Sequence, residues 1–153
     1  MSAYSSQNRK LPVLSAMLAA LFTLPACGPV KRINPPAASL QRLAVEADGR
    51  LAVTLRVQNH SDVSTRVARF DGTIELGGRA PTPFAVAIDL DVPAHAAEVV
   101  VATLPGSDWR PAPDRTLRYR LAGRLATSEP RGNYEVEYES MLSPVPGIPG
   151  EYR

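Results

Sequence analysis

The segment LAVTLRVQN, residues 51–59, decides the fold. Apolar side chains occupy every second position and small or polar ones lie between them: Leu51, Val53, Leu55 and Val57 against Ala52, Thr54, Arg56 and Gln58. Successive side chains of a β-strand point to opposite faces. The period of two therefore predicts a strand with one face on a core and the other in solvent.

The same alternation continues on both sides of this segment, with turn residues between the strands. Asp48-Gly49 precedes it and is a hairpin signal. Six further segments have strand character: residues 40–47, 67–78, 83–92, 97–104, 116–127 and 133–142. Together they predict an all-β fold, an antiparallel β-sandwich of about seven strands of the immunoglobulin or fibronectin kind, over residues 40–142.

Some segments carry more specific expectations. AEVVVATL, residues 97–104, is apolar almost throughout, which predicts a central strand covered on both faces. If 116–127 pairs with 133–142, two arginines face a row of glutamates, and structural ion pairs explain these charges better than a binding patch. These residues are Arg118 and Arg120, against Glu135, Glu137 and Glu139. The proline- and glycine-rich residues 143–153 predict a flexible tail.

The amino-acid composition excludes several classes of protein. The chain has 153 residues, of which 44% are hydrophobic and 21% charged, and this balance excludes a fully disordered polyelectrolyte. A single cysteine excludes a disulfide framework and any multi-cysteine metal site. Without Arg9 and Lys10 the chain holds 15 basic and 15 acidic side chains, dispersed among one another. A nucleic-acid partner is therefore not expected.

The first residues have the organisation of an export signal. The cationic pair Arg9-Lys10 precedes Leu11–Leu24, which is 14 residues without a charge. A membrane-spanning helix needs about 20 apolar residues, so this stretch is better suited to a signal-peptide core. An ordinary secretory signal with an incidental cysteine and an uncleaved anchor remain the alternatives.

Residues 24–27, LPAC, resemble the lipobox of bacterial lipoproteins. The resemblance implies a signal peptide over residues 1–26, cleavage between Ala26 and Cys27, and acyl chains on Cys27 that attach the protein to a membrane. Gly28 stands where an aspartate would resemble an inner-membrane retention signal. By analogy with enterobacterial sorting, the expected location is the outer membrane, facing the periplasm. Residues 27–39 then form the lipidated cysteine and a proline-rich tether.

Residues 51–79 resemble the opening of the late embryogenesis abundant group 2 domain, also called the WHy domain. Asn59 matches the first asparagine of the family motif, while His60 and Ser61 depart from the Pro-Asn that commonly follows. The second strand of the motif is matched by Phe70, Ile74, Leu76 and Gly77. The resemblance extends over roughly residues 36–142 and implies a seven-stranded sandwich with a non-enzymatic role in desiccation or other stress.

Asn59 also has an interpretation that does not depend on the family. An asparagine at a strand end can hydrogen-bond its own backbone two residues on and can adopt left-handed geometry. We therefore expect Asn59 to end its strand and to shape the loop that follows.

No catalytic residue, metal or cofactor is expected. His60 and His95 are the only histidines and lie in predicted loops, and no GxSxG elbow surrounds a serine. Asp71, Asp89 and Asp91 could suggest calcium, but strand alternation already explains them as outward residues. Trp109 could contact a sugar or a partner protein. The favoured alternative is that it covers one open end of the sandwich.

Two functions remain after these exclusions. The first is a lipid-anchored envelope protein with a non-enzymatic stress-protective or binding module, which could act on client proteins. The second is a protein-interaction subunit of an envelope or secretion assembly, using an exposed strand edge. A cryptic hydrolase is a third and weaker hypothesis.

Overall fold

The computed structural model describes residues 28, 30–104 and 110–153, and in these residues the chain forms strands and no helix. The strands are β1 (Ala37–Val45), β2 (Leu51–Gln58), β3 (Thr65–Leu76), β4 (Thr82–Val92), β5 (Ala97–Thr103), β6 (Leu117–Glu129), β7 (Arg131–Leu142) and β8 (Glu151–Tyr152). No helix in the described residues is long and apolar enough to cross a membrane.

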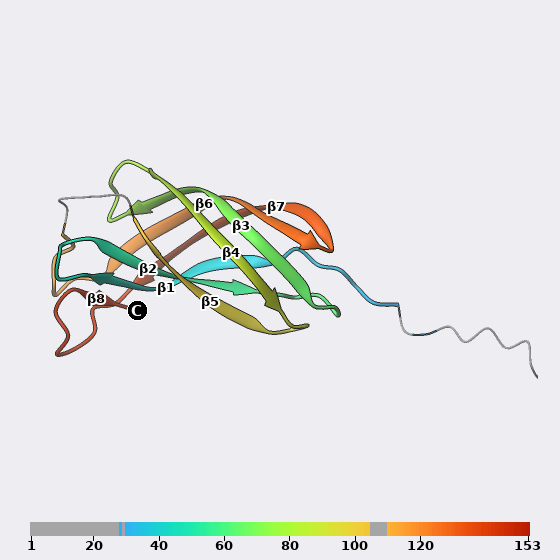
Figure 1. The fold of residues 1–153 in the computed structure, drawn as a ribbon. Coiled ribbons are helices and arrows are strands. Elements are labelled where there is room, and N and C mark those ends of the chain that lie inside the picture. The colour runs from blue at the N-terminus through green and yellow to red at the C-terminus, as the bar shows by residue number, and fades with distance from the viewer. Residues whose placement is uncertain (1–27, 29, 105–109) are drawn as a thin grey trace, which may run out of the picture. The chain divides into compact units, whose positions relative to one another are not determined.

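The strands form two sheets that pack face to face (Figure 1). One sheet has the order β5-β2-β1-β8 and the other the order β4-β3-β6-β7. Every pair of neighbouring strands is antiparallel. The predicted antiparallel β-sandwich is therefore confirmed, with the short β8 as an addition to the expected strands.

The core lies between the sheets, where the alternating strand contributes as predicted. The four apolar side chains of β2 are all at most 3% exposed: Leu51, Val53, Leu55 and Val57. From the facing sheet, the rings of Phe70 and Phe84 pack with their centroids 5.9 Å apart. Both aromatic side chains are at most 2% exposed, so the two sheets share one hydrophobic interior.

Strands β3 and β6 approach closely at a pair of glycines. Gly72 is opposite Gly123, and a Cβ atom on Gly72 would lie 2.1 Å from the carbonyl oxygen of Ala122. A Cβ atom on Gly123 would lie 2.9 Å from the Phe70 ring. The glycines are therefore required here for close strand packing. The register of β3 shifts earlier in the strand, between Val67 and Arg69.

The expectation of a central strand over residues 97–104 is wrong. Strand β5 lies at the edge of its sheet and pairs with β2. Val100 and Ala102 pack against the core, but Val99 and Val101 on the other face are 49% and 65% exposed. A continuous apolar run makes both faces of a strand suitable for burial, and here only one face is covered.

The expectation of a flexible tail over residues 143–153 is also wrong. Glu151 and Tyr152 form β8, which pairs with Ala44 and Leu43 of β1. Tyr152 is fully buried, and its hydroxyl donates to the carbonyl oxygen of Ala112 at 2.9 Å. The prolines and glycines make the turns that return the chain to the sheet, and one aromatic side chain then fixes the segment in the core.

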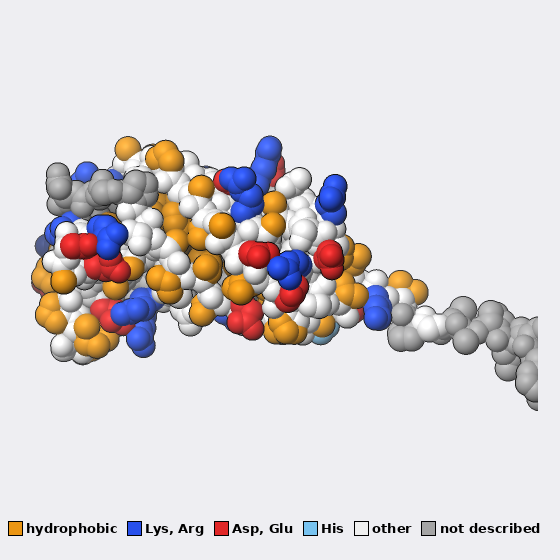
Figure 2. All heavy atoms as spheres, in the orientation of Figure 1, with side chains coloured by type: hydrophobic (Ala, Val, Ile, Leu, Met, Phe, Trp, Pro, Cys, Tyr) orange, Lys and Arg blue, Asp and Glu red, His pale blue; other side chains and the backbone are white. Residues whose placement is uncertain are grey.

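The charged side chains on the outer faces are largely paired. Basic and acidic groups lie next to each other on the face shown in Figure 2. Across β6 and β7, Arg118 and Arg120 pair with Glu139 and Glu137, as predicted, and Arg124 lies 3.9 Å from Glu135. These charges therefore connect neighbouring strands.

Candidate functional site

Asn59 organises the loop that follows β2. Its side chain is buried, and its Oδ1 accepts a hydrogen bond from the Ser61 backbone N–H at 2.9 Å, two residues on, as predicted. Its Nδ2 donates to the carbonyl oxygens of Val63, Val92 and Pro93 at 2.8, 3.0 and 3.1 Å. One amide therefore joins the loop after β2 to the end of β4. The backbone of Asn59 itself does not adopt the left-handed conformation.

The predicted tether is hydrogen-bonded to this loop. The Ser61 hydroxyl accepts from the Asn34 N–H at 2.9 Å and donates to the Asn34 carbonyl oxygen at 3.0 Å. The Asn34 amide donates to the His60 carbonyl oxygen at 2.7 Å. The Arg32 N–H donates to an Asp62 carboxylate oxygen, and the Asp62 N–H to the Arg32 carbonyl oxygen, both at 2.9 Å. We call these five residues the tether clamp.

The clamp changes the predicted domain boundary. The sequence placed the tether over residues 27–39 and the start of the sandwich at residue 40. In the structure the chain is held from Arg32 onwards, and β1 begins at Ala37. The proline-rich segment has no periodic hydrophobic pattern, so the sequence did not predict that it is ordered. Its order comes from hydrogen bonds to the loop after β2, which is distant in the sequence.

Asp62 is the charged centre of the clamp. The hydrogen bond from the Arg32 backbone N–H, followed by that from His95, holds the pKa of this carboxyl below its usual value. His95 Nε2 lies 3.0 Å from Asp62 Oδ1, and the His95 backbone is left-handed with φ 57°. This side chain is 65% exposed. His95 is therefore a loop residue, as expected, but one with a definite acidic partner.

The aspartates that the sequence offered for calcium are not gathered into a metal site in the described residues. Across the described ranges, no three His, Cys, Asp or Glu side chains converge in a way that could hold a metal ion. Arg66 lies between Asp89 and Asp91, at 2.8 and 2.9 Å, and Asp71 pairs with Arg69. Ion pairs thus account for the aspartates that were considered for calcium.

Three of the predicted functional residues lie outside the described residues. Ala26 and Cys27, the predicted cleavage and lipid-attachment residues, are not among them, and neither is Trp109. The lipid anchor and the contact or covering role of Trp109 therefore stay predictions.

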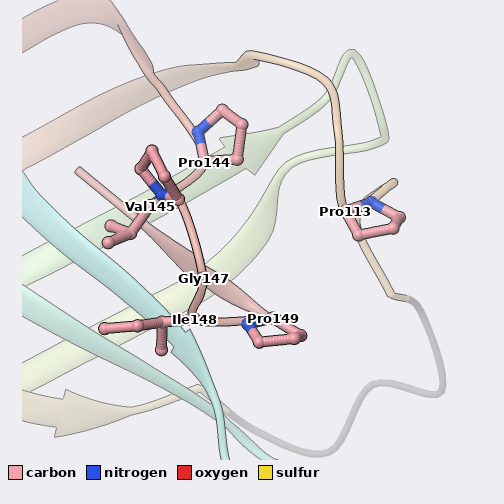
Figure 3. A pocket seen from close by; sticks show the side chains of 7 residues that line it. Pro113, Pro144, Val145, Gly147, Ile148 and Pro149 are labelled. Carbon is pink, nitrogen blue, oxygen red and sulfur yellow. The ribbon is translucent and has the colours of Figure 1, made fainter.

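A small apolar hollow lies beside the C-terminal turns, where the sequence predicted no structure. It has a volume of about 310 Å³, and Figure 3 shows the side chains around it. Its lining consists of Pro113, Pro144, Val145, Pro146, Gly147, Ile148 and Pro149. The described residues of this lining offer no charged group and no polar side chain to orient a ligand, which most small-molecule sites require.

The open edge of β5 is the second exposed apolar feature. Val99 and Val101 project from the outer face beside Arg56 and Thr54 of β2. A strand edge presents unpaired backbone N–H and C=O groups, and it can therefore accept another strand. Exposed valines would add apolar contacts to such a pairing.

Comparisons with known proteins add little to this description. The chain matches no protein-family model and no curated protein. One similar solved structure is described as "Crystal structure of protein from Archaeoglobus fulgidus". It is 12% identical, with a TM-score of 0.37, and the match covers 74% of this chain and 98% of that one. At this level the likeness supports no conclusion about fold or function.

Proposed function

We propose that the chain is a lipid-anchored protein of the bacterial cell envelope, attached through acyl chains on Cys27 to the outer membrane and facing the periplasm. Its sandwich is a non-enzymatic binding or stress-protective module of the late embryogenesis abundant group 2 type. The observation that carries the proposal is the tether clamp. It connects a residue shortly after the lipobox to the folded domain through paired hydrogen bonds at Arg32 and Asn34.

The clamp limits the distance between an anchor and the domain. Five residue steps separate Cys27 from Arg32. A fully extended chain covers at most about 3.6 Å per residue, so the Cα atom of Arg32 would lie within about 18 Å of the Cα atom of Cys27.

The protective role is supported by the family resemblance and by the form of the surface. The outer faces carry many charged side chains, and these are paired with one another across strands. Such a surface is well hydrated and carries no strong field of one sign, which suits weak contacts with many clients.

The first experiment determines the mature amino terminus. Mass spectrometry of the protein purified from bacterial membranes should detect an acylated Cys27, and Cys27→Ser should release the chain from the membrane fraction. The protective role is tested separately, by drying or osmotic shock of cells that lack the gene. Survival should be restored by the parent gene and not by the Cys27→Ser gene. An unacylated mature terminus at another position would refute the anchor.

The alternative function is a subunit of an envelope or secretion assembly. The exposed valines on the open edge of β5 favour it, since a partner strand could extend the sheet there. Crosslinking in intact cells should then capture one stoichiometric partner, whereas a protective protein should capture a diffuse set of clients.

A pair of matched variants sharpens this test. Val101→Lys places a charge on the β5 edge, and Met141→Lys places one on β7. The two parent side chains are almost equally exposed, at 65% and 64%. Loss of the partner with Val101→Lys alone would support strand addition at β5, and equal retention with both variants would exclude it.

A further inference from the structure

A β-bulge on the outer face of sheet β5-β2-β1-β8 opens a second, polar pocket. Leu40 of β1 is paired with Leu55 of β2, and Arg42 with Thr54, which leaves Gln41 as an extra residue between the two pairs. Bulges of this kind re-aim side chains and are frequent beside functional sites. Here the bulge borders a pocket of about 360 Å³.

The pocket is lined by side chains that donate hydrogen bonds. Its lining is Gln41, Arg42, Thr54 and Arg153, and we call it the arginine pocket. Two guanidinium groups, a hydroxyl and a carboxamide thus surround one depression. Three of these residues come from β1 and β2, and the fourth follows β8 at the end of the C-terminal segment.

Both arginines are positioned by the same buried carboxylate. Glu151 is 6% exposed, and its Oε2 accepts from Arg42 Nη2 at 2.8 Å. Arg153 Nη2 lies 2.9 Å from the other oxygen, Oε1. Among these three side chains, two positive charges lie against one negative charge.

The guanidinium groups keep donor capacity that the protein does not use. An arginine has five N–H donors, and Glu151 engages one nitrogen of each side chain. Among the described residues, Arg42 Nε and Glu151 Oε1 are both buried without a hydrogen-bond partner, and Oε1 is in contact with Arg153 only as an ion pair. A buried donor without an acceptor is costly, so an oxygen atom that reached Arg42 Nε would stabilise it, while the same ligand would have to avoid Glu151 Oε1.

We propose that the arginine pocket binds a phosphate-type oxyanion. Guanidinium groups recognise phosphate oxygens through charge-assisted, often bidentate, hydrogen bonds, and the Thr54 hydroxyl can donate one more. The same chemistry could be supplied by free phosphate or by the phosphodiester of a lipid headgroup. This site involves neither Cys27 nor the clamp, so the proposal stands independently of the anchor.

The test is a titration of the purified full chain in a maltoside detergent, which contains no phosphate. Inorganic phosphate is one probe, and glycerophosphoglycerol, a soluble phosphodiester headgroup, is the other. Binding is followed by calorimetry and by NMR shifts of the Thr54 and Arg153 amides. Saturable binding that weakens as salt is raised is expected. Binding of the phosphodiester would identify a headgroup as the source, and binding of inorganic phosphate alone would identify free phosphate.

The decisive variant is Arg153→Gln, since the Arg153 side chain is 66% exposed and its removal leaves the Arg42–Glu151 pair in place. Loss of one charge-assisted bond should weaken binding about tenfold. Thr54→Val should weaken binding by a smaller factor. Arg124→Gln is the matched control, because it removes an exposed guanidinium from the other sheet. No saturable binding, or equal weakening by Arg153→Gln and Arg124→Gln, would overturn the proposal.

Discussion

Two proline-rich segments flank the sandwich, and the structure fixes them by different physical means. The tether is held at Arg32 and Asn34 by hydrogen bonds to one loop, while Val30 and Ile33 remain 88% and 56% exposed. The tail is held by strand pairing and by Tyr152, which is fully buried. One attachment is therefore mainly polar and the other mainly hydrophobic.

This difference in attachment predicts how each segment separates from the sandwich. Segments with few buried apolar contacts open locally at low free energy, whereas segments built into the core open only with the whole domain. We therefore expect the tether to open without unfolding the sandwich, and the tail to stay in place until the sandwich unfolds. The following predictions test this contrast.

The largest effect should come from Tyr152→Ala. The change removes a fully buried aromatic side chain and leaves a cavity between β8 and the core. Truncation of a large aromatic residue in a core costs about 3–5 kcal/mol in the free energy of unfolding. Urea denaturation monitored by circular dichroism measures the loss.

Tyr152→Phe is the control for this change. It keeps the ring and removes the hydroxyl that donates to Ala112, so it should cost only about 1 kcal/mol. If Tyr152→Ala were no more destabilising than Tyr152→Phe, the tail would not be part of the hydrophobic core.

The next largest effect should come from Asn59→Ala. Four hydrogen bonds of one side chain are lost, and the carbonyl oxygen of Val92 loses a buried donor. Unsatisfied buried groups cost about 1–3 kcal/mol each, so a loss of about 2–3 kcal/mol is expected. Asn34→Ala, at an exposed position of the same clamp, should change stability by less than about 0.5 kcal/mol. Equal losses in urea denaturation would show that Asn59 is not the centre of the loop.

The same contrast explains what the sequence could and could not predict. The period of two at Leu51, Val53, Leu55 and Val57 depends only on neighbouring residues, and the strand it predicts is confirmed. The hydrogen bond from the Ser61 backbone N–H to the Asn59 side chain also depends only on neighbouring residues. The tether clamp, by contrast, joins residues about 30 positions apart.

The errors over β5 and over the C-terminal tail have the same origin. The exposure of Val101 depends on whether another layer covers the outer face of β5, and the sequence does not contain that information in any local pattern. The burial of Tyr152 depends on a space beside Leu43, more than 100 positions earlier in the chain. The arginine pocket was not predicted for this reason, since Arg42 and Arg153 meet only after the tail has folded onto β1.

A smaller and pH-dependent effect is expected at the tail. The hydrogen bond from Arg42, followed by the charges of Arg42 and Arg153, holds the pKa of Glu151 below its ordinary value of 4.5. The unfolded chain then binds a proton more readily than the folded one. The stabilisation is present above about pH 4.5 and is lost as the pH falls through the lower folded pKa.

Denaturation at about pH 6 and about pH 3 measures this loss. Other carboxylates also contribute to acid unfolding, so the comparison is with Glu151→Gln, which cannot titrate. The variant should be less stable than the parent at the higher pH, and the difference between them should shrink at the lower pH. A constant difference would show that the charge of Glu151 does not stabilise the attachment of β8.

The smallest effect on global stability should come from Asp62→Asn, which is also the most direct test of the polar tether. The exposed carboxylate accepts from the Arg32 N–H and pairs with His95, and both bonds favour its charged form. An amide of the same size weakens both, but no buried apolar contact changes. The free energy of unfolding should shift by less than about 0.5 kcal/mol, while hydrogen exchange at the Arg32 amide should accelerate.

Asp48→Asn is the matched control for that change. Asp48 is an exposed carboxylate that accepts from the Arg50 N–H at 3.0 Å, and its pKa is likewise held below the usual value, first by that bond. It lies in the β1–β2 turn, so exchange at Arg50 should rise and exchange at Arg32 should not. Since a polar attachment opens bond by bond, faster exchange should stay near the altered carboxylate. If Asp62→Asn instead accelerated exchange throughout β1, the tether and the core would unfold together, and the contrast between the two segments would be lost.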